Sequence, residues 1–454
     1  MSENEKAIFE TMPVTKAVIA MSLPNVLSSL VMILYNLADT FFVAALNDPI
    51  ESAAVTLAGP VLLAFNVVNN LFGVGSSSLM SRSLGLQDFD RVRKTASFGF
   101  YGALIFGGLF SLTVTALETQ LLFLLGADST TASATREYLF WTMSLGAIPS
   151  IVNVVFAYLV RAEGASLQAS IGTMSGCLIN IILDPFFVLP QFLGMGAAGA
   201  GLATFLSNCA ACLYFFIMLK MRKDTTFVSV HPSFFKPTAQ MTREIWAVGF
   251  PAAIQNLLNV TGMMVLNNYA AIYGVEAVSA MGISHKIVMV PLNVALGFSF
   301  GIMPLLSYNY ASGNTPRLKK ILAFAFGLAI SVMVIMTVIL FTFGAEIMNV
   351  FMDNPIIVGY GGQFIKLSCI GLPFLCLDFI AVGVFQACGM GKYAFIFAVL
   401  RKIIFEIPAM EIWNRIYPLY GLALAIPTAE FILAIIAVIY LRRFFRKLEQ
   451  RSIA

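Results

Sequence analysis

Long apolar stretches alternate with short polar segments along almost the whole chain. A membrane-spanning helix needs about 20 mainly apolar residues. Twelve stretches meet this requirement, at 16–46, 52–81, 95–117, 137–160, 166–189, 195–219, 244–273, 277–310, 320–343, 358–386, 393–414 and 418–441. The pattern therefore predicts an all-α integral membrane protein with twelve transmembrane helices. Because twelve is an even number, both ends of the chain are expected on the same side.

The composition supports lipid as the main solvent. Of the 454 residues, 59% are hydrophobic and only 11% are charged, with a mean hydropathy of +0.87. A soluble protein of this length carries far more charge on its surface. The polar segments on one side hold 21 of the 27 lysines and arginines. The positive-inside rule therefore predicts a multi-pass protein of the cell (inner) membrane with both termini in the cytoplasm. The net charge of +4 has the same origin and does not indicate nucleic-acid binding.

Cysteine and histidine give little sign of metal or redox chemistry. The six cysteines lie in apolar stretches without CxxC spacing, so they are interpreted as small buried hydrophobic residues. Neither of the two histidines stands in an HExxH motif, which argues against an intramembrane metalloprotease. The sequence predicts no resident cofactor.

The two halves of the chain resemble each other. Pro24 matches Pro251 at an offset of 227, and Pro149 matches Pro373 at 224. "DRVRK" from Asp90 likewise matches "PRLKK" from Pro316 at 226. The pattern predicts an N-terminal lobe at 1–225, a cytoplasmic linker at 226–243 and a C-terminal lobe at 244–454. Two six-helix lobes inserted in the same orientation are a transporter architecture. A single packed bundle with a decayed duplication is the alternative.

Four polar residues are predicted at one depth in the first lobe. Asp39 lies about seven residues, or roughly 10 Å, from the outer end of its span. Asp184 and Thr204 lie at similar depths in the fifth and sixth spans, and Asn180 shares a helix face with Asp184. A carboxylate at bilayer depth costs about 2.5 to 3.5 kcal/mol on insertion scales. Such residues usually face the protein interior and mark a site.

The expected pocket is rich in oxygen. Pro185 has no N–H, which leaves the carbonyl of Ile181 free beside Asn180 and Asp184. Oxygen ligands suit a hard cation such as Na⁺, and a carboxylate beside a second carboxylate in a dry setting can instead hold a proton. Asn153 is a further candidate, although its expected depth fits less well. The alternative is that these groups only bind neighbouring helices.

The second lobe does not repeat this set of residues. It has its own ionisable residues inside the predicted spans, and Lys402 and Glu406 are expected to pair along one helix face. Asp378 and Glu430 are candidates for a substrate site or a second proton site. The sequence assigns no role to Lys286 or Arg401.

Several motifs resemble the multidrug and toxic compound extrusion (MATE) family, most of all its MepA-like branch. They are "SLPNVLSSLVMILYNLADTFFV", "FGVGSSSLMSRSLGLQDFDRVRK", "RAEGASLQASIGTMSGCLINIILDP" and "GMGAAGAGLATFLSN". The resemblance implies two lobes around a V-shaped central cavity, and export of cationic amphipathic drugs in exchange for H⁺ or Na⁺. It also implies cation-site roles for Asp39, Asn153, Asn180, Asp184 and Thr204, with possible Na⁺ ligands at Asp39, Asn180 and Asp184. Pro24 resembles the family's helix-bending proline.

Two positions depart from the family pattern. One branch has a sodium-binding glutamate eight residues after the second-lobe proline, where this chain has Asn259. The equivalent of Arg161 in the second lobe is Gln386.

Two other functions are considered beside export. A lipid or lipid-linked oligosaccharide flippase of the wider superfamily would need several basic residues in its cavity, for which Lys286, Lys366, Arg401 and Lys402 are the candidates. An intramembrane enzyme would need a nucleophile and base or a metal set, and none of the usual motifs is present. The expected partners are small organic cations and the lipid bilayer, and the expected state is a monomer.

Overall fold

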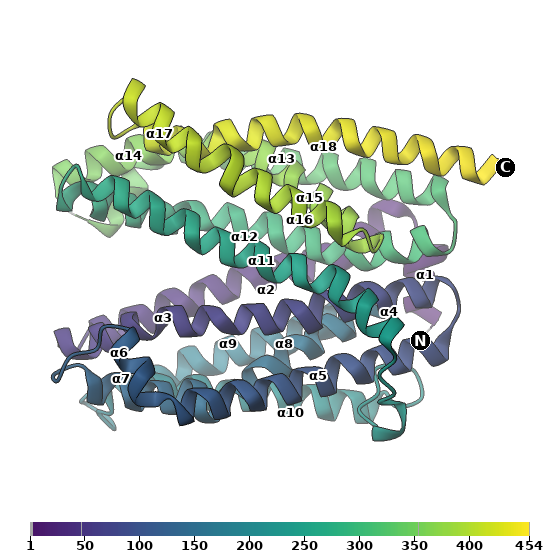
Figure 1. Cartoon of the computed structure of the whole chain (residues 1–454), viewed down its shortest axis with the longest axis horizontal. Helices are drawn as coiled ribbons and strands as arrows, with labels where there is room; N and C mark the ends of the chain where they lie inside the picture. Colours follow the sequence, from purple (N-terminus) through teal and green to yellow (C-terminus); the bar gives the residue numbers. More distant parts are fainter. Residues whose placement is uncertain (1–2, 47, 353, 454) are drawn as a thin grey trace. The chain divides into compact units, whose positions relative to one another are not determined.

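The computed structural model describes residues 3–46, 48–352 and 354–453, and all regular structure within these ranges is helical (Figure 1). The first half of the chain supplies six of the predicted spans. They are α2 (Val14–Ala44), α3 with η1 and α4 (Pro49–Asn69, Asn70–Val74 and Gly75–Gly85), α5 (Phe89–Ala116), α7 with η2 and α8 (Ala132–Leu139, Phe140–Leu145 and Ala147–Ala162), α9 (Ser166–Val188) and α10 (Gly196–Met221).

The second half supplies the other six spans. They are α11 (Ala239–Ala271), α12 (Val275–Ala311), α13 (Thr315–Phe351), α14 with α15 (Pro355–Cys369 and Leu372–Ala387), α16 with η4 and α17 (Gly391–Val399, Leu400–Glu406 and Ile407–Ile416) and α18 (Gly421–Ile453). Three short helices outside the predicted spans complete the described chain, namely α1 (Glu3–Glu10), α6 (Glu118–Leu124) and η3 (Pro232–Phe234).

The spans satisfy the length and composition of membrane helices. Among the described residues, eight helices are long and apolar enough to cross a membrane, and two bent pairs raise this number to ten. The remaining two predicted spans are α11 and the continuous run from α16 to α17. Large apolar side chains are exposed along many of these helices, for example Ile335 and Val338 on α13. Lipid is the solvent that such a surface requires.

Four spans are interrupted, which the apolar pattern did not predict. The π-helices η1, η2 and η4 interrupt the second, fourth and eleventh spans. Sharp bends divide α7–η2 from α8 by 49° and α14 from α15 by 50°. The bends occur at Gly146 and at Ile370–Gly371, just before Pro149 and Pro373. These two prolines are equivalent in the repeat, so the repeat extends to the bends.

Helix starts and turns also repeat. Asp88 caps α5 by accepting the Arg91 N–H, and Asn314 caps α13 by accepting the Arg317 N–H in the same way. Gly164 and Gly389, 225 positions apart, both adopt the left-handed conformation, with φ of 94° and 74°. Equivalent caps and turns support two pseudo-symmetric six-helix lobes.

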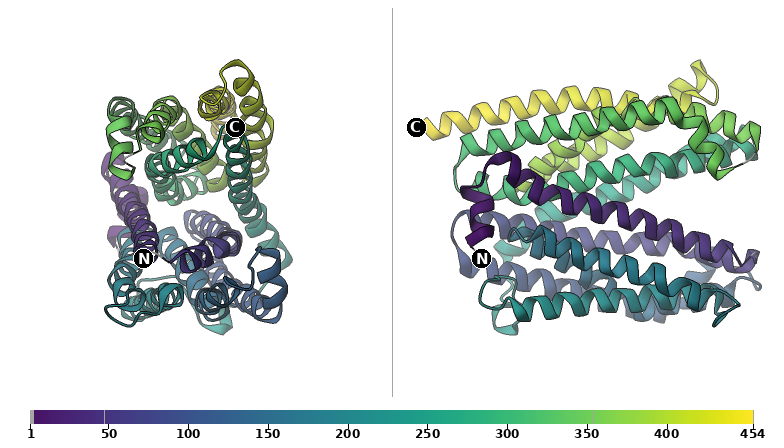
Figure 2. Two further views of the ribbon diagram at one scale, coloured as in Figure 1. Left: turned by 90° about the vertical axis from the view of Figure 1, so that its left-hand side faces the viewer. Right: turned by 180° about the vertical axis from the view of Figure 1, so that it is seen from behind.

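The chain divides into two compact units. Unit 1 comprises 1–11 and 27–253, and unit 2 comprises 12–26 and 254–454. In unit 2, α12 packs against α13, α14 and α15, and these helices run alongside one another (Figure 2). The division falls within α2 and α11, two residues after Pro24 and Pro251 respectively. Each of these helices therefore contributes one part to each unit.

Unit 1 contains a buried acid outside its predicted spans. Glu163 follows α8 and is fully buried, and its carboxylate accepts hydrogen bonds from the Thr226 hydroxyl and from the Phe227 N–H at 2.8 Å. Glu5 and Arg222, which form an ion pair, lie nearby. Burial raises the pKa of Glu163 to about 7, against the opposing effect of these hydrogen bonds.

This acid makes the stability of the protein depend on pH. Between pH 4.5 and 7 the folded protein binds the Glu163 proton more tightly than the unfolded chain does, so stability falls as the pH rises through this window. We expect Glu163→Gln to flatten this slope and to unfold at a higher temperature than wild type above pH 7. Thermal unfolding in detergent from pH 5 to 8 measures both effects. The exposed Glu137→Gln is the control, and an unchanged slope in Glu163→Gln would contradict the assignment.

Candidate functional site

The site in unit 1 starts from two residues one turn apart on α2. Tyr35 and Asp39 share a helix face because they are four positions apart. The Tyr35 hydroxyl forms a hydrogen bond with Thr204 on α10. The Oδ1 atom of Asp39 is buried and has no hydrogen-bond partner among the residues that the structure describes.

Asn180 and Asp184 form the next part of the site on α9. Both side chains are buried. When both atoms of the Asn180 amide face complementary partners, Nδ2 donates to Asp184 Oδ2 at 2.9 Å and Oδ1 accepts from the Thr204 N–H at 3.0 Å. The Oδ1 atom of Asp184 is buried and has no partner within the described part of the chain. The Asp184 carboxylate lies close enough to interact electrostatically with Asp39. The structure thus brings Asp39, Asn180, Asp184 and Thr204 together from three helices.

Asn153 reaches this site indirectly. Its Nδ2 donates to Asn208 Oδ1 at 2.6 Å, and Asn208 Nδ2 donates to the Thr204 carbonyl at 2.8 Å. The amide of Asn208 therefore links α8 to the backbone beside the site.

Two tyrosines that were not predicted from the sequence also belong to the site. Tyr35 contacts Thr204, and Tyr138 on α7 is buried near Tyr35, Asp39 and Asp184. For Tyr35 the signal was its position four residues before Asp39. For Tyr138 no signal was available, because its proximity depends on how α7 packs in the unit.

The arrangement is suited to binding a small positive charge. Two carboxylates lie close together, and each has one buried oxygen without a partner. Amide and hydroxyl oxygens surround them, and Pro185 leaves the Ile181 carbonyl without a donor from its own helix. A proton held between the carboxylates or a bound Na⁺ would relieve the repulsion of their charges. Among the described residues, no group of three or more His, Cys, Asp or Glu side chains could hold a metal ion.

Unit 2 holds a separate buried group of charges. Arg401 in η4 donates from Nε to Glu430 Oε1 on α18 at 2.6 Å, and its guanidinium lies 4.6 Å from the centre of the Phe379 ring. Asp378 lies close enough to interact electrostatically with both Arg401 and Glu430. Asp378 and Glu430 each have one buried oxygen that no described residue bonds. The structure therefore brings the two candidate acids together around one arginine.

The predicted pair of Lys402 and Glu406 is present, with an N–O distance of 2.6 Å. Of the four candidate bases for a flippase cavity, Arg401 and Lys402 are each bonded to a carboxylate. Two of the four candidate cations for the flippase alternative are therefore already paired with acids.

Pro24 lies within α2, where the helix passes from unit 2 to unit 1. On its N-terminal side α2 packs closely on α12, since a Cβ added to Gly301 would lie 2.6 Å from Ser22 Cα. Two residues beyond the division, the Ser28 hydroxyl contacts that of Thr173 at 2.5 Å within unit 1. Each part of α2 is thus fixed within its own unit.

A repeated set of six apolar spans, with pairs of acidic side chains inside the spans, is the architecture of a multi-pass membrane transporter. The MatE family profile matches residues 24–186 and 251–410. The chain belongs to this family.

Relatives and solved structures agree over nearly the full length. The "Multidrug export protein MepA" of Staphylococcus saprophyticus is 31% identical over 446 residues, which cover 98% of this chain and 97% of that protein. MepA of Staphylococcus aureus is 31% identical over 445 residues, with the same coverage. The structure described as "Outward-facing conformation of a multidrug resistance MATE family transporter of the MOP superfamily" matches with a TM-score of 0.93 and 24% identity, over 99% of each chain. These comparisons establish the family and the fold.

Proposed function

We propose that the protein is a multidrug efflux antiporter that exports cationic amphipathic organic compounds in exchange for H⁺ or Na⁺. One observation carries the proposal. Asp39 and Asp184 approach each other in a hydrogen-bonded pocket, and each keeps a buried oxygen without a protein partner. The relatives described as multidrug export proteins support the substrate class.

The coupling ion is proposed to act by favouring one of two states. Binding a proton or Na⁺ at Asp39 and Asp184 removes the repulsion between the carboxylates, so it stabilises the arrangement in which they are close together. Release of the ion stabilises an arrangement in which they are further apart. We place both termini in the cytoplasm, as the distribution of basic residues predicts, with a single chain as the working unit.

An efflux assay tests this proposal. Cells expressing the protein are loaded with an ethidium-like dye, and export is followed with and without a protonophore and with and without external sodium. Export that stops on removing one of the two gradients supports an antiporter and names the ion. Export that is insensitive to both, or no export of any cationic dye, would argue against it.

We propose that Pro24 supplies the bend that couples the site to transport. Proline has no N–H and cannot bond to the Ala20 carbonyl, so the helix is weakened between the part of α2 in unit 2 and the part bearing Asp39. Pro24→Ala restores that donor. We expect export to be several-fold slower while the unfolding temperature stays equal or rises, measured by dye efflux and thermal unfolding. Export at the wild-type rate would remove this role.

A further inference from the structure

The helix α18 ends in a basic segment of unit 2. Residues 421–441 of this helix are mainly apolar and extend about 31 Å at 1.5 Å per residue, which matches the hydrocarbon core of a bilayer. Arg442, Arg443, Arg446 and Lys447 follow directly, and all four side chains are exposed. The last turns of α18 extend beyond the neighbouring helices of unit 2 (Figure 1). We therefore expect the basic side chains at the level of the lipid headgroups.

Two of these arginines continue a strip of exposed apolar side chains. Phe431, Ile435 and Ile439 lie four positions apart on one face of α18 and are exposed by 50%, 49% and 46%. Arg442 and Arg446 follow at spacings of three and four, so they lie on the same face. We call these five side chains the α18 strip. Its apolar part lies within the span and its basic part just beyond, which is the order of the acyl chains and the headgroup of a lipid.

Other side chains hold the end of α18 within unit 2. The Phe444 ring packs 6.1 Å from that of Tyr310 at the end of α12. The Lys319 amine on α13 lies 5.9 Å from the centre of the Phe445 ring and forms an ion pair with Glu449. Phe444 and Phe445 are less exposed than the arginines beside them. These two rings make the contacts with α12 and α13, which leaves the α18 strip open to its surroundings.

The charge at this end of α18 is positive. None of the four basic side chains forms an ion pair with any side chain in the part of the chain that the structure describes. Glu449 is the acid nearest to them in sequence, and it is already paired with Lys319. A cluster of basic side chains directly after a membrane span attracts anionic lipids.

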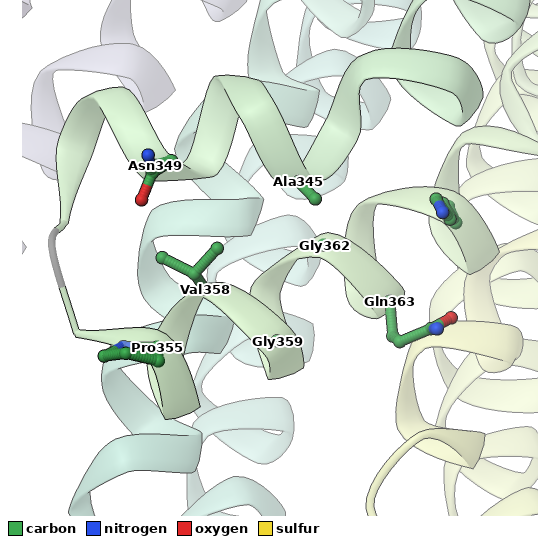
Figure 3. A pocket seen from close by; sticks show the side chains of 8 residues that line it. Ala345, Asn349, Pro355, Val358, Gly359, Gly362 and Gln363 are labelled. Atoms are coloured by element: carbon green, nitrogen blue, oxygen red, sulfur yellow. The ribbon is translucent and has the colours of Figure 1, made fainter.

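The α18 strip is distinct from a cavity of about 410 Å³ in unit 2. That cavity lies between the C-terminal part of α13 and α14, and its lining includes Lys366 (Figure 3). The end of α18 instead contacts Lys319, near the start of α13. Since most of the length of α13 separates the two places, a substitution of Lys366 can serve as a control for the α18 strip.

We propose that the α18 strip binds an anionic phospholipid. The Arg442 and Arg446 guanidinium groups, one helical turn apart, would donate to the phosphate oxygens of a single headgroup. An acyl chain of the same lipid would lie along the three apolar side chains of the strip. The flanking Arg443 and Lys447 disfavour a headgroup that carries a positive charge of its own, such as that of phosphatidylcholine. The proposal does not depend on which ion drives transport.

Lipid binding to the purified full-length protein tests the site. Phosphatidylglycerol or phosphatidylcholine is titrated into detergent-solubilised protein, and bound lipid is measured by native mass spectrometry. We expect the double variant Arg442→Gln with Arg446→Gln to bind phosphatidylglycerol about 30-fold more weakly, which is the loss expected for two basic residues beside an anionic headgroup. Wild type should bind phosphatidylglycerol more tightly than phosphatidylcholine, and the double variant should lose this preference.

A matched control removes the same charge from the same helix outside the α18 strip. The double variant Arg443→Gln with Lys447→Gln should lose much less phosphatidylglycerol binding, and Lys366→Gln should bind as wild type does. All variants should unfold at the wild-type temperature without added lipid, because the substituted side chains of α18 are exposed. Equal losses in the two double variants would indicate a diffuse attraction to the positive helix end and would overturn the site. Wild-type binding by Arg442→Gln with Arg446→Gln would also overturn it.

Discussion

Replacing Asp39 by Asn is expected to abolish export of ethidium-like dyes while the protein still reaches the membrane in normal amount. The amide is nearly isosteric with the carboxylate, but it cannot hold a proton in exchange and is a weaker ligand for Na⁺. Asp184→Asn should give the same result, since the two carboxylates share one site. The measurement is dye efflux from cells with expression matched by immunoblot.

The control for this experiment is Asp224→Asn, the same chemical change at an exposed position between α10 and η3. It should export at the wild-type rate. Wild-type export by Asp39→Asn would remove Asp39 from the coupling site. Loss of export in Asp39→Asn together with full export in Asp184→Asn would mean that the two acids do not act as one site.

Tyr35 belongs to the same site as Asp39, but only the aspartate could be predicted from the sequence. Tyr35 bonds to Thr204 and lies beside both acids, so it helps to position the site. Tyr35 could not be recognised from the sequence, because tyrosine is common in membrane proteins and costs little to insert. The aspartates were found because a carboxylate in an apolar stretch is costly and therefore rare.

The spans were predictable for a similar reason. A run of about 20 apolar residues has few alternatives to a membrane helix, and all twelve predicted runs are helical. The interruptions were not predictable from hydropathy, because π-helical and α-helical residues have the same apolar composition. The π-helix η4 shows which contacts could be predicted and which could not. The local pair of Lys402 and Glu406 could be predicted from its spacing, whereas the pair of Arg401 and Glu430, 29 positions apart, depends on how η4 packs against α18.

Arg401→Met is expected to destabilise unit 2 by about 3 to 5 kcal/mol, the cost of leaving one member of a buried ion pair without the other. Arg401 and Glu430 are only 3% and 0% exposed, and Asp378 lies beside them. Removing Arg401 leaves two buried acids close together, and the nearby Lys402 is already paired with Glu406. Thermal unfolding in detergent measures the loss. The matched control is Arg415→Met, which breaks an exposed pair with Glu411 and should unfold at nearly the wild-type temperature.

The double variant Arg401→Met with Glu430→Met distinguishes a structural role of the buried pair from a role in transport. Replacing both partners by apolar side chains of similar volume removes one of the two acids that Arg401→Met leaves without Arg401, so part of the lost stability should return. If the stable double variant exports dye normally, the pair only holds η4 against α18. If it is stable and inactive, the pair takes part in transport, with Glu430 as a substrate site or a second proton site. Should Arg401→Met alone unfold at the wild-type temperature, the pair would not stabilise the protein, and the first of these two explanations would fail.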